Sequence, residues 1–272
     1  MTPQDRLRAL PIWPSAPTIL RLQAGRTNEN FVVACGRQRF FGRISIDLPH
    51  HGIHRRDEAR MATAAAESGI GPAVRYARDG ILVADFIGGR PLEAADLRSA
   101  KTLQRIAELL RRLHQSPPPA EAPVFELGAV CRRYLGQIPP AEMADDARQR
   151  ISQTLDAVPI LSADAVIHAD LVPENLIDDG ERLWLVDWEY AGRGNPATDL
   201  AILAMNADLD AHLTAELVHS HGAEDLAAVQ ALRPAAAIRE ALWTLVQMQA
   251  VGARGDLSDY SRRCFARIGL PR

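Results

Sequence analysis

The sequence predicts an α+β protein with two lobes, a small β-rich N-terminal lobe and a larger, mainly helical C-terminal lobe. Three observations lead to this fold class. Residues 17–46 and 75–86 alternate short apolar runs with turns that contain Gly, Asn and Asp, a pattern typical of antiparallel hairpins. From residue 97 onward, apolar side chains recur at helical spacing. A hinge containing Gly and Pro separates the two parts, so we place the lobes at residues 1–87 and 88–272.

The N-terminal lobe is expected to contain five strands and one helix. Residues 55–68 are rich in alanine and are followed by glycine and proline, which predicts a helix that ends there. The loop at 47–54 contains three histidines, which we expect to be solvated rather than to bind a metal. The strands are expected at residues 18–22, 30–35, 39–46, 75–77 and 81–86.

The C-terminal lobe is expected to be helical on both sides of one β-rich stretch. A stripe of leucine and isoleucine over residues 97–113 ends before three prolines, as a helix would. A further helix is expected to begin at Ala197. The other predicted helices cover residues 130–135, 145–155, 210–232, 234–250 and 257–268.

Composition excludes several classes of function. A net charge of −3 and a pI near 6.2 give no basic surface for nucleic acid. The sequence has neither a signal peptide nor a run of about 18 uncharged apolar residues, which predicts a cytoplasmic protein without membrane insertion. Cys35, Cys131 and Cys264 are too scattered to suggest a disulfide framework or a zinc site. A homodimer is left open.

The most informative stretch is residues 166–190. Its first half contains His168-Ala-Asp170-Leu-Val-Pro-Glu-Asn175, and its second half is an apolar run that ends on Asp187. Two short strands joined by a turn would bring these polar side chains together. One carboxylate at a nucleophile, with an Asn and a second carboxylate as oxygen ligands for Mg²⁺, is what phosphoryl transfer from ATP requires. The stretch therefore predicts a kinase-type catalytic loop.

Asp187-Trp-Glu-Tyr190 extends this pattern to a family. It stands where protein kinases carry D-F-G and choline kinases carry D-F-E-Y, so the chain resembles the choline/ethanolamine kinase branch of the aminoglycoside-phosphotransferase-like kinases. The resemblance covers most of the chain, from Gly25 to Tyr260. It implies a two-lobed, protein-kinase-like fold and an ATP- and Mg²⁺-dependent phosphotransferase. The implied substrate is a small cationic alcohol, with choline and ethanolamine as the leading candidates.

The resemblance implies a role for each residue of the catalytic stretch. Asp170 accepts the proton of the substrate hydroxyl as that oxygen attacks the γ-phosphate. His168 supports the loop by hydrogen bonding rather than by proton chemistry, and Asp199 braces it. The catalytic residues implied are Asp170, Asn175 and Asp187, and the metal ligands are Asn175, Asp187 and, more weakly, Glu189.

The resemblance also implies residues for the nucleotide and for the acceptor alcohol. Arg43 stands where the family has its phosphate-binding Lys or Arg, with Glu58 as its ion-pair partner, and Asn28 helps to position the phosphates. A substrate ammonium group requires aromatic faces. The residues matched to such a cage are Tyr190, Trp243 and Tyr260.

Alternative functions stay open at this point. Asn206 stands where choline kinases tend to carry an acid, although Asp208 could replace it, and this puts choline itself in doubt. Thiamine kinase and aminoglycoside phosphotransferase are alternatives within the enzyme class. A pseudokinase-like nucleotide-binding protein is the alternative outside it, since no Gly-rich phosphate motif is present.

Overall fold

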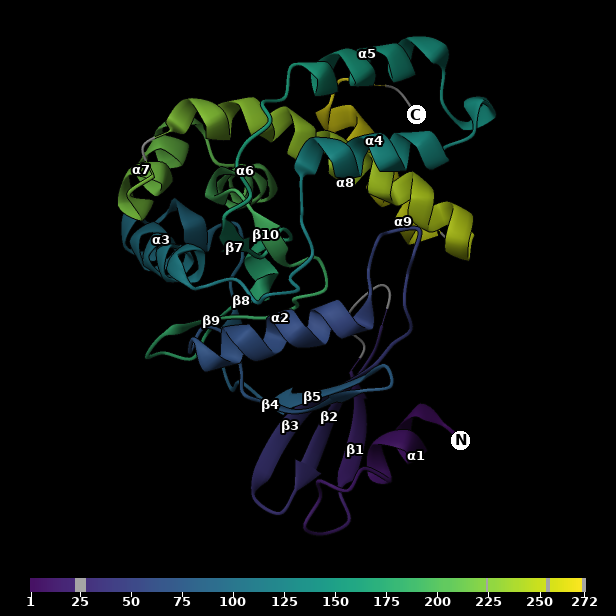
Figure 1. Ribbon diagram of the computed structural model, residues 1–272, viewed down its shortest axis with the longest axis vertical. Coiled ribbons are helices and arrows are strands. Elements are labelled where there is room, and N and C mark those ends of the chain that lie inside the picture. Colours follow the sequence, from purple (N-terminus) through teal and green to yellow (C-terminus); the bar gives the residue numbers. More distant parts are fainter. Residues whose placement is uncertain (23–27, 224, 253–254, 271–272) are drawn as a thin grey trace.

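The computed structural model describes residues 1–22, 28–223, 225–252 and 255–270. Figure 1 shows the two lobes that the sequence predicted, with the antiparallel sheet at the bottom and the helical part above it. The α+β fold class is therefore confirmed. No helix among the described residues is both long enough and apolar enough to cross a membrane.

The N-terminal lobe is an antiparallel sheet in the order β1-β2-β3-β5-β4. Alternate residues of β2, including Phe31 and Val33, are buried on one face with Leu7 of the N-terminal helix, which forms a small core of its own. The predicted turn between β1 and β2 lies largely at residues 23–27, outside the described part. The elements are α1 (Pro3–Arg8), β1 (Thr18–Leu22), β2 (Glu29–Cys35), β3 (Gln38–Ile44), α2 (Arg55–Glu67), β4 (Val74–Arg78) and β5 (Ile81–Asp85).

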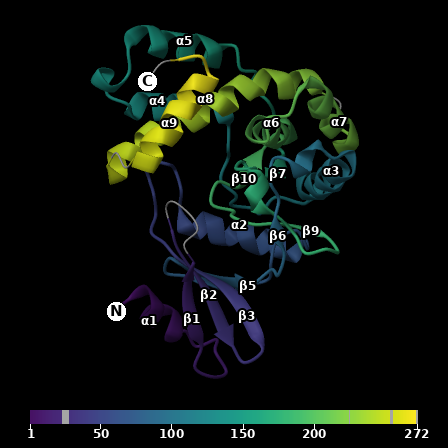
Figure 2. The same ribbon diagram turned by 180° about the vertical axis from the view of Figure 1, so that it is seen from behind.

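Helix α2 connects the two lobes. It lies between the sheet and the helical part (Figures 1 and 2). Its first turn carries Glu58. Met61, Ala62 and Ala65 are buried in the large hydrophobic core that also contains the C-terminal helices, rather than in the small core of the sheet. The helix therefore carries residues to the cleft between the lobes. The proposed boundary between residues 87 and 88 stays a prediction.

The C-terminal lobe consists of helices around two small sheets. Helix α8 contacts α4, α6 and α9, so it lies at the centre of this lobe. Its helices are α3 (Ala100–Gln115), α4 (Leu127–Gln137), α5 (Asp145–Asp156), α6 (Pro196–Asn206), α7 (Ala211–His221), α8 (Leu226–Val251) and α9 (Gly255–Arg267).

The sequence predicted two helices at 210–232 and 234–250, and the break between them was placed at the wrong residues. The first helix ends at Gly222, which adopts a left-handed φ of 79° that suits glycine, and the Asp225 side chain caps the start of α8. Pro234 lies inside α8 and does not end it. An interior proline removes one backbone donor and crowds the preceding turn, and burial of the surrounding residues against the four neighbouring helices α4, α5, α6 and α9 offsets that cost.

Two small sheets hold the catalytic stretch. Strand β7 (Ala165–Ile167) pairs with β10 (Gly192–Gly194), and β8 (Leu176–Asp178) pairs with β6 (Arg90–Pro91) and β9 (Leu183–Leu185). Residues 168–175 run between the two sheets, and residues 186–191 return between them. This arrangement brings both halves of the predicted motif to the same side of the lobe.

Candidate active site

The backbone of the catalytic loop is held in a strained conformation. Ala169 has φ of 61°, a left-handed value that is uncommon for residues other than glycine. The carboxylate of Asp199, at the start of α6, accepts hydrogen bonds from the backbone N–H groups of His168 at 2.8 Å and Ala169 at 2.7 Å. His114 on α3 lies 3.0 Å from the same carboxylate. The predicted bracing contact of Asp199 is thus present.

His168 has the structural role that the sequence predicted. It is fully buried, its Nε2–H donates to the carbonyl oxygen of Val186 at 3.0 Å, and its Nδ1 accepts from the backbone N–H of Asp170 at 3.3 Å. These two contacts require the neutral Nε2–H tautomer. Burial also lowers the pKa of His168, which favours that neutral form. His168 thereby joins the two halves of the catalytic stretch.

Asp170 follows the strained Ala169 in this loop, and 25% of its side chain is exposed. Enclosure by the surrounding protein raises the pKa of Asp170 to about 7, and the guanidinium of Arg239 opposes that rise. Arg239 Nη2 lies 3.3 Å from Asp170 Oδ1, and Arg239 Nη1 donates to the carbonyl oxygen of Ala169 at 2.6 Å. A carboxylate with a pKa near neutrality can accept a proton at physiological pH.

Asn175 and Asp187 line a cavity of about 500 Å³ between the lobes. The Asn175 side chain donates from Nδ2 to the carbonyl oxygen of Asp170 at 3.0 Å, so the carboxamide oxygen is its atom suited to a cation. Apolar residues of both lobes line much of the cavity, among them Phe41, Ala84 and Ile177, and Arg43 and Glu58 also line it. An apolar cleft with oxygen donors at one end fits a nucleotide and its Mg²⁺.

This oxygen donor set is open rather than a complete metal cage. The described part of the chain has no group of three or more His, Cys, Asp and Glu side chains arranged to hold a metal. Mg²⁺ commonly binds one or two carboxylates and completes its shell with phosphate oxygens and water. Asn175 and Asp187 therefore fit an ion that arrives with a nucleotide.

The predicted ion pair between Arg43 and Glu58 is confirmed. Arg43 Nη1 donates to Glu58 Oε1, and it also lies 2.9 Å from Asp187 Oδ1. Arg43 and Glu58 are buried, with side chains 5% and 3% exposed. Burial by itself would raise the pKa of Asp187, but the Arg43 guanidinium holds it below its ordinary value. One arginine thus joins β3, α2 and the catalytic stretch.

Arg55, which sequence reasoning missed, forms a second bridge beside the first. It donates to Glu58 Oε2 at 2.8 Å, to Glu189 Oε2 at 2.9 Å and to Asn28 Oδ1 at 2.9 Å. Asn28 donates in turn to Glu189 Oε2 at 3.1 Å. Glu189 and Asn28 thus face Arg55 and are not among the residues that line the 500 Å³ cavity. Their assigned roles with metal and phosphate stay predictions. The position of Arg55 three residues before Glu58 in the same helix is the sequence feature that could have predicted their ion pair.

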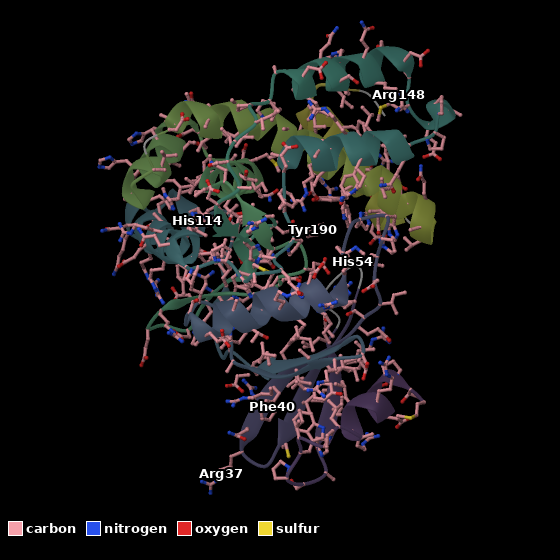
Figure 3. The ribbon with its side chains drawn as sticks, viewed as in Figure 1. Arg37, Phe40, His54, His114, Arg148 and Tyr190 are labelled. Atoms are coloured by element: carbon pink, nitrogen blue, oxygen red, sulfur yellow. The ribbon has the colours of Figure 1, made fainter. Side chains whose placement is uncertain are left out.

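Two of the three predicted cage residues are in direct contact. Trp243 Nε1 donates to the hydroxyl of Tyr190 at 3.0 Å, and both side chains are half-buried. The third, Tyr260 on α9, donates its hydroxyl to the carboxylate of Glu240 on α8. Figure 3 places Tyr190 above α2, on the side of the helical part that faces the cleft. Asn206 donates to the carbonyl oxygen of Leu171 at 3.0 Å and supports the catalytic loop.

The prediction that the loop histidines are solvated was wrong for His51. Its side chain is buried, lies 2.7 Å from Gln247 Oε1, and stacks on Trp243 with ring centroids 5.3 Å apart and 20° between the planes. Burial lowers the pKa of His51 to about 4, so the ring is neutral. The loop extends from the sheet up to α8 (Figures 1 and 2), and the Arg133 side chain donates to the His51 carbonyl oxygen at 2.8 Å. Packing on distant helices buries a residue that its neighbours in sequence suggested was exposed.

Comparisons with known proteins identify the family and the fold. Residues 18–254 match the phosphotransferase enzyme family. Over 194 residues, 68% of the chain, the sequence is 26% identical to Protein LicA of Haemophilus influenzae, and the match spans 57% of that protein's length. The solved structure of a choline/ethanolamine kinase family protein from Mesorhizobium loti matches with a TM-score of 0.75 and 28% identity, covering 98% of this chain and 93% of that one.

A second solved structure supports the fold alone. Choline kinase LicA from Streptococcus pneumoniae has a TM-score of 0.75 and 20% identity, with 93% of each chain covered. A structure of LicA in complex with AMP matches with the same TM-score and covers 95% of this chain and 94% of that one. The family match covers most of the sequence and includes the whole catalytic stretch. The chain belongs to the phosphotransferase enzyme family.

Proposed function

We propose that the protein transfers the γ-phosphoryl group of ATP, with Mg²⁺, to the hydroxyl of a small amino alcohol of the choline and ethanolamine type. The observation that carries this proposal is the position of Asp170. It lies on the same loop as Asn175, whose side chain donates to its carbonyl oxygen, and Arg239 connects its carboxylate to the ring of Tyr190; burial raises the pKa of Asp170 to about 7. The relatives point the same way, because they include proteins named as choline kinases.

Each residue would contribute to one part of the reaction. Asp170 would orient the substrate hydroxyl and accept its proton. Asn175 and Asp187 would hold Mg²⁺, which would supply positive charge to offset that of the nucleotide phosphates. Arg43, whose guanidinium lines the 500 Å³ cavity, would bind phosphate oxygens. The structure of LicA with AMP supports an adenine nucleotide as the donor.

A panel assay tests the proposal. Purified protein would be incubated with ATP and Mg²⁺ against choline, ethanolamine, thiamine and an aminoglycoside, and the phosphorylated products would be identified by mass spectrometry. We expect phosphate on the hydroxyl of an amino alcohol. Omitting Mg²⁺ is the control, and it is expected to abolish product formation. Nucleotide binding without phosphorylation of any panel member would contradict the proposal and would favour the pseudokinase-like alternative.

A further inference from the structure

One face of Tyr190 is already covered by a cation that belongs to the chain. The guanidinium carbon of Arg239 lies 4.5 Å from the centre of the Tyr190 ring, within the range in which a cation is attracted to an aromatic face. Arg239 is 3% exposed. Its hydrogen bond to the carbonyl oxygen of Ala169 and its ion pair with Asp170 fix the guanidinium at this place. The guanidinium of Arg239 is therefore a fixed component of the site.

Trp243 is similarly engaged. One face of its indole stacks on the ring of His51, and its N–H donates to the hydroxyl of Tyr190. A substrate cation bound at the Tyr190 ring would lie close to the guanidinium of Arg239. Like charges in a buried site repel strongly because little water screens them. Of the aromatic residues predicted as a cage for a substrate ammonium group, Tyr190 thus already contacts the chain's own cation, and Trp243 already contacts His51 and Tyr190.

The acid next to Arg239 offers a different kind of recognition. Glu240 follows it on α8, three residues before Trp243, so the side chains of Glu240 and Trp243 project from neighbouring positions of the helix surface. Glu240 accepts a hydrogen bond from Tyr260. Its charge contributes to the raised pKa of Asp170, so the two carboxylates are within electrostatic reach of each other. A carboxylate can accept N–H bonds from a primary ammonium, whereas a quaternary ammonium has no N–H to donate.

We propose that Arg239 is a specificity-determining residue that occupies the cation position at Tyr190, so that the site selects alcohols with a primary ammonium, bound by Glu240, over quaternary ones such as choline. This inference rests on the proposed function, because it names the substrate class of the same site. Arg239 was not predicted from the sequence. The sequence feature that could have indicated Arg239 is its position four residues before Trp243, which places both residues on one face of α8.

The first test compares choline with 3,3-dimethyl-1-butanol, a neutral alcohol of the same shape, by kcat/KM in the wild-type protein. A working aromatic cation site should favour choline by tenfold or more. We expect the two values to agree within about threefold, and ethanolamine to exceed both. A tenfold preference of the wild type for choline over the neutral alcohol would overturn the inference.

The second test uses Arg239→Met, which removes the charge and keeps a long apolar side chain. Because Arg239 contacts Asp170, we expect overall activity to fall, so the readout is the ratio of kcat/KM for choline to that for the neutral alcohol. This ratio should rise about tenfold. Arg233→Met is the matched control, since Arg233 also lies on α8 and donates to the carbonyl oxygens of Ala204 and Leu209. A rise in both variants, or in neither, would contradict the assignment of Arg239.

A binding measurement separates this inference from the proposed function. Tetramethylammonium binding, followed by calorimetry, requires no phosphoryl transfer. We expect Arg239→Met to bind it at least about tenfold more tightly than the wild type, and equal affinity would overturn the inference. Absence of any phosphorylated product would instead refute the proposed function and leave this measurement decisive. If Arg239→Met does not fold, the wild-type comparison of choline with its neutral analogue still decides.

Discussion

The two ends of the active site use arginine in different ways. At the nucleotide end, Arg43 and Arg55 each bridge carboxylates of α2 and of the catalytic stretch, so they connect the two lobes. At the acceptor end, Arg239 contacts Asp170 and the ring of Tyr190, all within the C-terminal lobe. In the first arrangement, the ion pairs of Arg43 with Asp187 and of Arg55 with Glu189 link the relative position of the lobes to the charges of these two carboxylates. The second holds the carboxylate of Asp170, the proposed base, and covers one face of Tyr190.

This difference predicts which substitutions should affect ATP and which should affect the acceptor alcohol. Changes in the bridges at the nucleotide end should alter ATP binding and the stability of the whole molecule, because they leave buried charges without partners. Changes at the acceptor end should alter kcat or the KM for the alcohol. Substitution of Asp170, the proposed base, should reduce turnover whichever alcohol is the acceptor.

The largest effect is expected for Asp170→Asn, which keeps the size of the side chain and removes its capacity to accept the proton. We expect kcat to fall by about 10²- to 10⁴-fold, with the dissociation constant for ATP changed by less than about threefold, since Asp170 does not line the nucleotide cavity. Steady-state kinetics and ATP titration measure the two quantities. Retained turnover would remove Asp170 from the role of base.

The next largest effect is expected for Arg43→Ala. It leaves Glu58 buried with one cation fewer and Asp187 without its Arg43 partner, so we expect a loss of about 3–5 kcal/mol in the free energy of unfolding and a higher KM for ATP. Urea unfolding and kinetics check both. Arg43→Lys is the matched control, because it keeps the charge and should recover part of both losses. An unchanged KM for ATP in Arg43→Ala would show that this arginine does not bind phosphate.

A smaller effect is expected for Trp243→Phe at the acceptor end. The substitution removes the N–H that donates to Tyr190 and reduces the stacking surface for His51. Loss of one such hydrogen bond corresponds to a rise of about three- to tenfold in the KM for the alcohol. The KM for ATP, measured in the same assays, serves as the internal control. A change confined to ATP would place Trp243 outside the acceptor site.

The smallest effect concerns pH and His51. Its pKa in the folded protein is about 4, below its ordinary value of 6.5, because burial disfavours the charged ring. Between these values the unfolded chain binds the proton and the folded one does not, so acidification through this window destabilises the fold. We expect the loss of stability from pH 7 to pH 5 to be smaller by about 1–2 kcal/mol in His51→Gln. Urea unfolding at both pH values measures this difference, and an equal loss in both proteins would contradict it.

Prediction from sequence succeeded best where the partners lie close in the chain or in a fixed motif. The strands and α2 were placed within a few residues, and the Arg43–Glu58 pair was predicted from the family resemblance. The continuous α8 was missed because a proline is a strong local signal, while the burial that overrides it depends on four other helices. The histidine loop was misjudged for the same reason.

The sequence by itself determined which candidate residues come together. Asp170, Asn175 and Asp187 occur at a spacing that two short strands and a turn bring close, so local structure was sufficient to predict the Asn175–Asp170 contact and the cavity lined by Asn175 and Asp187. Only the tertiary structure decided what surrounds them. Arg239 contacts Asp170, which lies 69 residues earlier in the sequence, and His51 contacts Gln247, which lies 196 residues later. Such pairings depend on how helices and loops pack, because burial and electrostatic contact act through space rather than along the chain.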